Sequence, residues 1–93
     1  MDTILLEISD AAARHKFIKG VILFGSRARG DNRPRSDIDL SVYADGDIYD
    51  FIEDIEENVH TLLEFDISDM RGEFDDNFID QIEKDGVVIY EQS

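Results

Sequence analysis

The chain has 93 residues, of which 42% are hydrophobic and 34% are charged, and its 23 acidic and 9 basic side chains give a net charge of −14. A chain of this length is expected to form one small domain, residues 1–93, with little stability to spare. The acidic charge argues against direct nucleic-acid binding, because neutralising phosphates needs a basic surface. It favours a basic protein partner instead.

Further function classes are excluded by what the sequence lacks. There is no cysteine, which rules out disulfides and thiolate chemistry, and two histidines alone argue against a zinc site. No apolar run reaches the length of a membrane span, and the N-terminus lacks the apolar core of a signal peptide. We therefore expect a cytoplasmic protein that does not associate with a membrane.

The first third of the chain predicts a helix, a strand and a loop. Residues 3–15 place apolar side chains at helical spacing. Residues 21–24 form a short apolar run between two glycines, which is typical of a buried strand. Residues 26–29 indicate a turn or short helix, and residues 30–35 contain Gly, Asp, Asn and the only Pro, so we expect a loop.

The remaining elements alternate between strands and helices. Residues 36–43 alternate apolar and polar side chains, as a half-buried strand does, and residues 48–58 form an amphipathic helix. Residues 61–67 predict a third strand. A helix capped by Asp75 or Asp76 runs to Lys84, and residues 87–90 predict a last strand. The pattern indicates an α/β (α+β) fold in which helices cover the apolar face of one sheet.

Two carboxylates two residues apart, Asp37 and Asp39, lie in the second predicted strand. Alternate residues of a strand point to the same side, roughly 6.5–7 Å apart, so both side chains can approach one ion. Carboxylates this close repel each other unless a cation lies between them. Magnesium is usually held by one or two carboxylates plus substrate phosphates. The spacing therefore predicts a magnesium site that faces away from the core.

A phosphate-binding turn is predicted just upstream. Gly25 lets the backbone approach a phosphate, and Ser26 offers a hydroxyl and an N–H group. Four arginines follow in the loop, of which Arg27 and Arg29 are the better candidates for phosphate contacts and Arg33 and Arg35 the weaker. Two-metal phosphoryl transfer normally needs a third carboxylate. Asp66 is the candidate, because it lies on the less apolar side of the third predicted strand, and Asp69 is its rival.

Gly25-Ser26, ten intervening residues and then Asp37-x-Asp39 resemble the signature of the DNA polymerase β-like nucleotidyltransferase superfamily. The fuller string GSRARG…SDIDL is similar to the minimal nucleotidyltransferases (MNT), many of which are antitoxins paired with HEPN-domain ribonuclease toxins. The resemblance covers nearly the whole chain. It implies the polymerase β-like fold, a small mixed sheet of about four strands with helices packed on one face.

The resemblance also implies an activity and residue roles. AMP would be transferred from ATP to a hydroxyl, in MNT–HEPN pairs a toxin tyrosine, and the transfer silences the toxin. Asp37, Asp39 and Asp66 would be the catalytic residues and the ligands of two Mg²⁺ ions. The nucleotide-binding residues would be Gly25, Ser26, Arg27, Arg29 and Ser36. Larger relatives add a helical domain that helps to bind base and acceptor, so we expect the toxin to complete the site in a hetero-oligomer.

Two other functions fit the sequence. The acidic domain could neutralise a basic ribonuclease by stoichiometric binding, without required catalysis. It could also be a nucleotidyltransferase that modifies small molecules such as aminoglycosides, although no part of the predicted domain is left over to bind such an acceptor. The presence of Ser26, Asp37 and Asp39 favours an enzyme over a protein that only binds. The two enzymatic functions differ in whether AMP is transferred to a protein or to a drug.

Overall fold

The computed structural model describes residues 3–30 and 37–93. Its helices and strands alternate for most of the chain, as the sequence predicts. In chain order they are α1 (Thr3–Arg14), β1 (Ile18–Phe24), α2 (Ser26–Arg29), β2 (Ile38–Ala44), α3 (Tyr49–Asn58), β3 (Phe65–Asp69), α4 (Asp76–Asp85) and β4 (Val87–Glu91). The predicted α/β fold class is confirmed.

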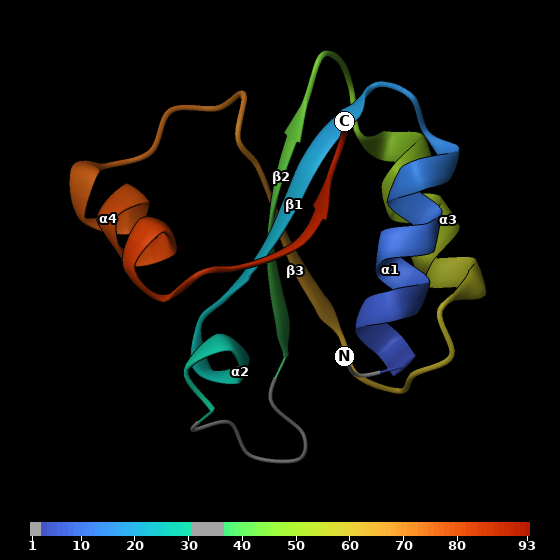
Figure 1. The fold of residues 1–93 in the computed structure, drawn as a ribbon, viewed down its shortest axis with the longest axis horizontal. Helices are drawn as coiled ribbons and strands as arrows, with labels where there is room; N and C mark the ends of the chain where they lie inside the picture. The colour runs from blue at the N-terminus through green and yellow to red at the C-terminus, as the bar shows by residue number, and fades with distance from the viewer. Residues whose placement is uncertain (1–2, 31–36) are drawn as a thin grey trace.

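The four strands form one mixed sheet in the order β3-β2-β1-β4. β1 is antiparallel to both of its neighbours, whereas β2 and β3 run parallel. The end of β1 therefore lies at the same end of the sheet as the beginnings of β2 and β3. Figure 1 shows α2 at this end as well.

The helices α1 and α3 lie side by side against one face of the sheet (Figure 1). Their apolar sides and the alternate residues of the strands form the main core. Its fully buried members include Ile8, Ala11, Ala12, Val21, Leu40, Val42, Phe51 and Ile55. The expectation that helices cover one apolar face therefore holds for these two helices.

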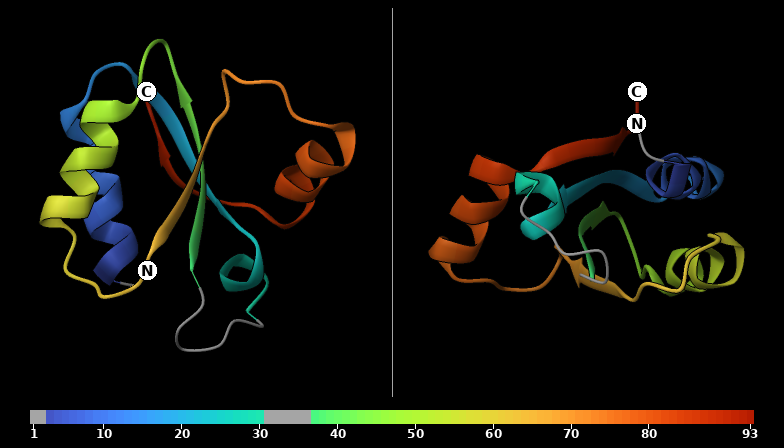
Figure 2. Two further views of the ribbon diagram at one scale, coloured as in Figure 1. Left: turned by 180° about the vertical axis from the view of Figure 1, so that it is seen from behind. Right: turned by 90° about the horizontal axis from the view of Figure 1, so that it is seen from below.

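The helix α4 lies on the opposite face of the sheet, where Figure 2 shows it separated from α1 and α3 by the strands. Phe78 packs edge-on against Phe24 of β1, with ring centroids 5.4 Å apart. Phe74 stacks on Phe78 at 4.9 Å, and Ile82 is 2% exposed. The last helix thus anchors on a small aromatic cluster, and the sheet is covered on both faces. The sequence pattern could not show on which face α4 packs, because it identifies the apolar side of each helix but not the face of the sheet that this side covers.

The strand boundaries that differ most from the prediction are the starts of β1 and β3. β1 begins at Ile18, three residues early, although Lys19 and Gly20 interrupt its apolar character, because pairing with β2 extends along it. β3 begins at Phe65 rather than at residue 61. Before it, the N–H of Leu63 donates to the Thr61 hydroxyl at 3.0 Å, a local turn that competes with the strand.

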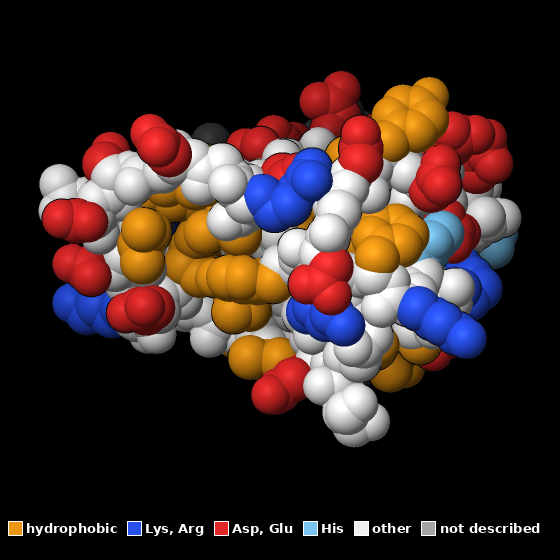
Figure 3. Space-filling model, turned by 90° about the horizontal axis from the view of Figure 1, so that it is seen from above, with side chains coloured by type: hydrophobic (Ala, Val, Ile, Leu, Met, Phe, Trp, Pro, Cys, Tyr) orange, Lys and Arg blue, Asp and Glu red, His pale blue; other side chains and the backbone are white. Residues whose placement is uncertain are grey.

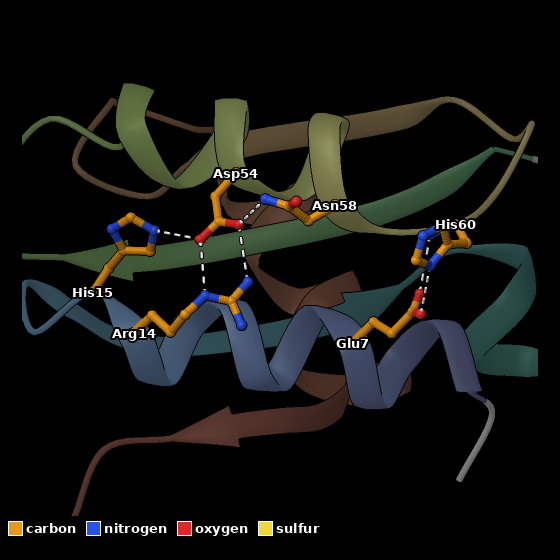
Figure 4. A network of polar contacts seen from close by, with 6 residues as sticks. All are labelled: Glu7, Arg14, His15, Asp54, Asn58 and His60. Atoms are coloured by element: carbon orange, nitrogen blue, oxygen red, sulfur yellow. Dashed lines mark hydrogen bonds and ion pairs between the residues drawn. The ribbon is translucent and has the colours of Figure 1, made fainter.

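A polar network joins α1 to α3 around Asp54 (Figure 4). The Asp54 carboxylate accepts hydrogen bonds from Arg14 at 2.9 Å and from Asn58 at 2.8 Å, and it lies 2.8 Å from His15 Nε2. Arg14, followed by Asn58 and His15, holds the pKa of Asp54 far below its usual value. The His15 ring also packs against Phe17 and Phe51. This histidine therefore has a structural role.

In residues 3–30 and 37–93, no helix combines the length and the apolar character needed to cross a lipid bilayer.

Replacing Gly86 with alanine should destabilise the fold. A Cβ there would overlap the Ile82 carbonyl oxygen and lie 2.6 Å from Ile22 Cγ2. Urea unfolding should show a loss of about 1–3 kcal/mol, typical of overpacking. Gly46→Ala is the matched control, since a Cβ at that position meets nothing within 4 Å, and it should change stability by less than about 1 kcal/mol. Equal effects of the two variants would contradict the close packing of α4 on β1.

Asp54→Asn should lower the free energy of unfolding by about 1–2 kcal/mol at pH 5, because charge-assisted hydrogen bonds between α1 and α3 are lost. The folded pKa of Asp54 is depressed, so the wild-type advantage is complete above the ordinary value of 3.8 and disappears as pH falls. Urea unfolding of both proteins at pH 5 and pH 3 measures this. Glu57→Gln, an exposed acid on the same helix, should show no such difference.

Candidate functional site

The predicted site residues gather at the end of the sheet where β1 stops and β2 and β3 begin. Asp39 is the second residue of β2, directly opposite Phe24, the last residue of β1. Asp66 is the second residue of β3, and the parallel register places it opposite Asp39. Because the partners lie on neighbouring strands at the same height, both carboxylates emerge on the same face of the sheet.

The environment of Asp39 disfavours an isolated negative charge. Partial burial raises its pKa most, and the charges of Asp66 and Asp37 raise it further. A hydrogen bond between the Asp39 and Asp66 side chains adds to the shift, while the positive charge of Arg29 opposes it. Two carboxylates this close repel each other when both are ionised, and a cation bound between them would relieve that repulsion.

Gly25 forms the wall of the site beside Asp39. Its φ is +76°, in the region that favours glycine, and it caps the short helix α2. A Cβ at this position would overlap Asp39 Oδ2 and would lie 3.1 Å from its Cγ. Glycine is therefore needed twice, for the backbone conformation and for the space that the carboxylate occupies.

The other predicted nucleotide-binding residues lie on α2 or just outside the described segments. Ser26 begins α2 and is half-buried, like Arg27, whereas Arg29 is exposed at its end. The effect of Arg29 on the pKa of Asp39 shows that its charge acts at the carboxylate pair. Ser36, Arg33 and Arg35 lie outside the described residues.

The structure separates the two candidates for a third acid. Asp66 is exposed and faces Asp39, as described above. Asp69 lies opposite Val42, further along the strand pair, and its carboxylate accepts hydrogen bonds from Arg71, the shortest at 2.8 Å. This pairing holds the pKa of Asp69 below its usual value. Asp66 is therefore in position to act with Asp39, and Asp69 is committed to its own ion pair.

The third carboxylate of the predicted set, Asp37, is exposed and immediately precedes β2. Among the described residues, no three His, Asp or Glu side chains already converge closely enough to hold a metal ion. The donors nevertheless fit magnesium, which takes one or two carboxylates and completes its shell with substrate phosphates and water. Asp39 and Asp66 supply such a pair, with Asp37 close enough to affect the pKa of Asp39.

Sequence reasoning missed how two neighbouring positions are used. Ser41 falls on the polar side of β2 but is completely buried, and its hydroxyl donates to the Ile22 carbonyl at 3.3 Å. The contact of Gly25 with the Asp39 carboxylate was also missed. In the sequence, a glycine directly after a buried strand indicates a turn, but it does not indicate that the Asp39 carboxylate packs against that turn.

Gly25→Ala should be more damaging than Gly30→Ala. Both glycines have positive φ, but their backbones differ. Gly30 (ψ 10°) lies in the left-handed region, where an alanine should lose about 1 kcal/mol, whereas Gly25 (ψ −155°) lies in a region that is essentially restricted to glycine, where the strain should be about 1–3 kcal/mol. A Cβ at Gly30 meets nothing within 4 Å, whereas at Gly25 it displaces the Asp39 carboxylate, which should cost a further 1 kcal/mol or so. Thermal or urea unfolding of the pair measures the difference, and equal losses would show that the site is looser at Gly25 than the geometry indicates.

Comparison with known proteins identifies the family and the fold of this chain. The family model described as Polymerase beta, Nucleotidyltransferase matches residues 7–93. A crystal structure of a toxin–antitoxin with AMP-PNP is similar, with a TM-score of 0.74 and 19% identity over 96% of this chain and 74% of that chain. A structure from Sulfolobus solfataricus, of a protein assigned as a nucleotidyltransferase, has a TM-score of 0.56 and 23% identity over 96% and 78% of the two chains. No curated protein matches the sequence significantly. Since the family model covers almost the whole sequence, this chain belongs to the polymerase β nucleotidyltransferase family.

Proposed function

We propose that this protein is an antitoxin that acts as a Mg²⁺-dependent protein adenylyltransferase. It would transfer AMP from ATP to a hydroxyl, most simply a tyrosine, of a HEPN-type ribonuclease toxin and thereby silence it. The observation that carries the proposal is the pairing of Asp39 with Asp66 across β2 and β3, beside Gly25 and α2. Similarity to a toxin–antitoxin structure with AMP-PNP supports both the nucleotide and the kind of partner.

Each residue of the site has a role in this reaction. Gly25 and Ser26 would hold the triphosphate, with Arg27 and Arg29 at its anionic oxygens. Asp37, Asp39 and Asp66 would hold two Mg²⁺ ions, which stabilise charge on the phosphates when bound. The acceptor oxygen forms a bond to the α-phosphorus, the bond to the bridging oxygen of the β-phosphate breaks, and pyrophosphate leaves. Asp66 would take the proton of the acceptor hydroxyl.

The exposure of the site supports a protein as the acceptor. Asp37, Asp66 and Arg29 are all exposed, whereas a small-molecule enzyme normally encloses most of its substrate. We infer that the partner covers this end of the sheet and completes the acceptor side. A reaction that consumes ATP and silences a ribonuclease belongs in the cytoplasm, where both substrates are present.

Asp39→Asn and Asp66→Asn should each abolish AMP transfer to the co-purified partner. The loss should be at least about 100-fold, because the charge that holds the cation or accepts the proton is removed. Intact-mass measurement after incubation with ATP and Mg²⁺ should show additions of about 329 Da, AMP less water, on the partner with the wild-type protein only. Asp69→Asn is the matched control on the same strand and should transfer normally.

Three outcomes would contradict the proposal. Full neutralisation of the toxin in cells by Asp39→Asn would favour stoichiometric binding. AMP found on an aminoglycoside and absent from protein would favour a small-molecule enzyme. Loss of transfer in Asp69→Asn with normal transfer in Asp66→Asn would reverse the assignment of the third acid.

A further inference from the structure

The face of the sheet that carries Asp39 also carries an apolar hollow, at the opposite end of the strands. We call it the sheet-face hollow. It has a volume of about 310 Å³, its apolar lining comes from Ile22, Tyr43, Val88 and Tyr90, and Lys19 and Glu91 supply charged groups at its edge. Figure 3, viewed from this end, shows apolar side chains gathered in a depression beside α4, with acidic side chains around them. Val88 is 53% exposed and Tyr43 37%.

The hollow exists because a glycine lies in β1 where a strand would normally carry a side chain. A Cβ at Gly20 would lie 3.6 Å from the Tyr90 carbonyl oxygen and 4.0 Å from Tyr43 Cδ2, both ordinary contact distances. A Cβ is therefore accommodated at this position, and because Gly20 lines the hollow a larger side chain would take up part of it. The adjacent strand β4 is the edge of the sheet, so the hollow is open on that side.

The charges around the hollow are negative in balance. Lys19 is 3.1 Å from Asp45 and donates to Gln92 at 2.8 Å, so its charge is already compensated. Within the described residues Glu91 forms no ion pair. The exposed side of α4 carries three acids and one base, namely Asp76, Asp80, Glu83 and Lys84, so the balance stays negative. An apolar surface bordered by acids is complementary to a segment that combines apolar and basic side chains.

We propose that the sheet-face hollow seats a basic, apolar-faced segment of the protein that carries the acceptor hydroxyl, an inference that rests on the proposed function. Tyr43 is four residues from Asp39 on the same side of β2, about 13 Å along the strand. A partner helix anchored at Tyr43 and Val88, about 10–12 Å wide, would leave only a short further distance to the carboxylate pair. Anchoring would raise the effective concentration of the acceptor at the site without any contact to ATP.

The test uses a synthetic amphipathic helix with one leucine face and one lysine face. Its binding to the full chain is measured by fluorescence anisotropy without nucleotide, and NMR amide shifts locate the contact. Val88→Glu, which places a charge in the hollow, and Gly20→Val, which fills it, should each weaken binding about tenfold or more. Leu62→Glu is the matched control, because Leu62 is fully exposed in the segment between α3 and β3, away from the hollow, and it should bind as wild type does.

The specificity of the surface is tested with two further peptides, one with glutamate for lysine and one with serine for leucine. Both should bind at least about tenfold more weakly. Equal binding of all three peptides, unchanged binding by Val88→Glu and Gly20→Val, or an equal loss in Leu62→Glu would overturn the inference. So would a homodimer, seen by sedimentation, that Val88→Glu dissociates, because a second copy would then occupy the hollow.

Titration of the same samples with MgATP separates this inference from the proposed function. We expect all three variants to bind MgATP as the wild-type protein does, since none of them alters the carboxylate pair. If wild-type protein binds MgATP but the peptide contacts lie elsewhere, the docking surface alone is refuted. If the peptide contacts Tyr43 and Val88 but MgATP does not bind, the proposed function fails and the surface remains.

Discussion

The parallel register between β2 and β3 is the constraint on which the site depends. Ile38 and Leu40 of β2 lie opposite Phe65 and Ile67 of β3, so burying these apolar residues fixes the register. The same register brings Asp39 and Asp66 face to face on the other side. A slip of one residue would turn every side chain of β3 to the opposite face and separate the acids. The core thus maintains a pair of like charges that, by themselves, would move apart.

Most of the local structure could be predicted because it follows from short-range patterns. Apolar spacing predicted α1, α3 and α4, and the capping of α4 by Asp75 is seen in its bond from the Phe78 N–H at 2.8 Å. Alternation in β2 predicted that Asp39 faces away from the core. The glycine–serine turn and the Asp-x-Asp pair were recognisable because their spacing in sequence carries the family resemblance, and the match of the family model over residues 7–93 confirms it.

What could not be predicted depends on contacts between distant segments. Alternation predicted Asp66 rather than Asp69 as the third acid, but it does not identify the neighbouring strand. The pairing of β3 with β2, which puts Asp66 opposite Asp39, and the Arg71 ion pair of Asp69 come only from the structure. The location of α4 across the sheet depends on Phe24, Phe78 and the close approach at Gly86. The network at Asp54 joins it to Arg14, 40 positions away, and nothing in the sequence around either residue indicates this contact.

Under the proposed function, a chain with a net charge of −14 would bind a triphosphate at paired carboxylates, which brings two negative groups together. The conflict disappears if a divalent cation enters with the nucleotide, because the ion reverses the local sign. The same excess charge would then serve a second purpose, since it would repel nucleic acid and attract a basic protein over distances of about 10 Å. Acidity and the apolar sheet face together would select the partner, while Asp39, Asp66 and Gly25 would determine the chemistry. These two proposed tasks would lie at opposite ends of one sheet face, so a small domain could perform both.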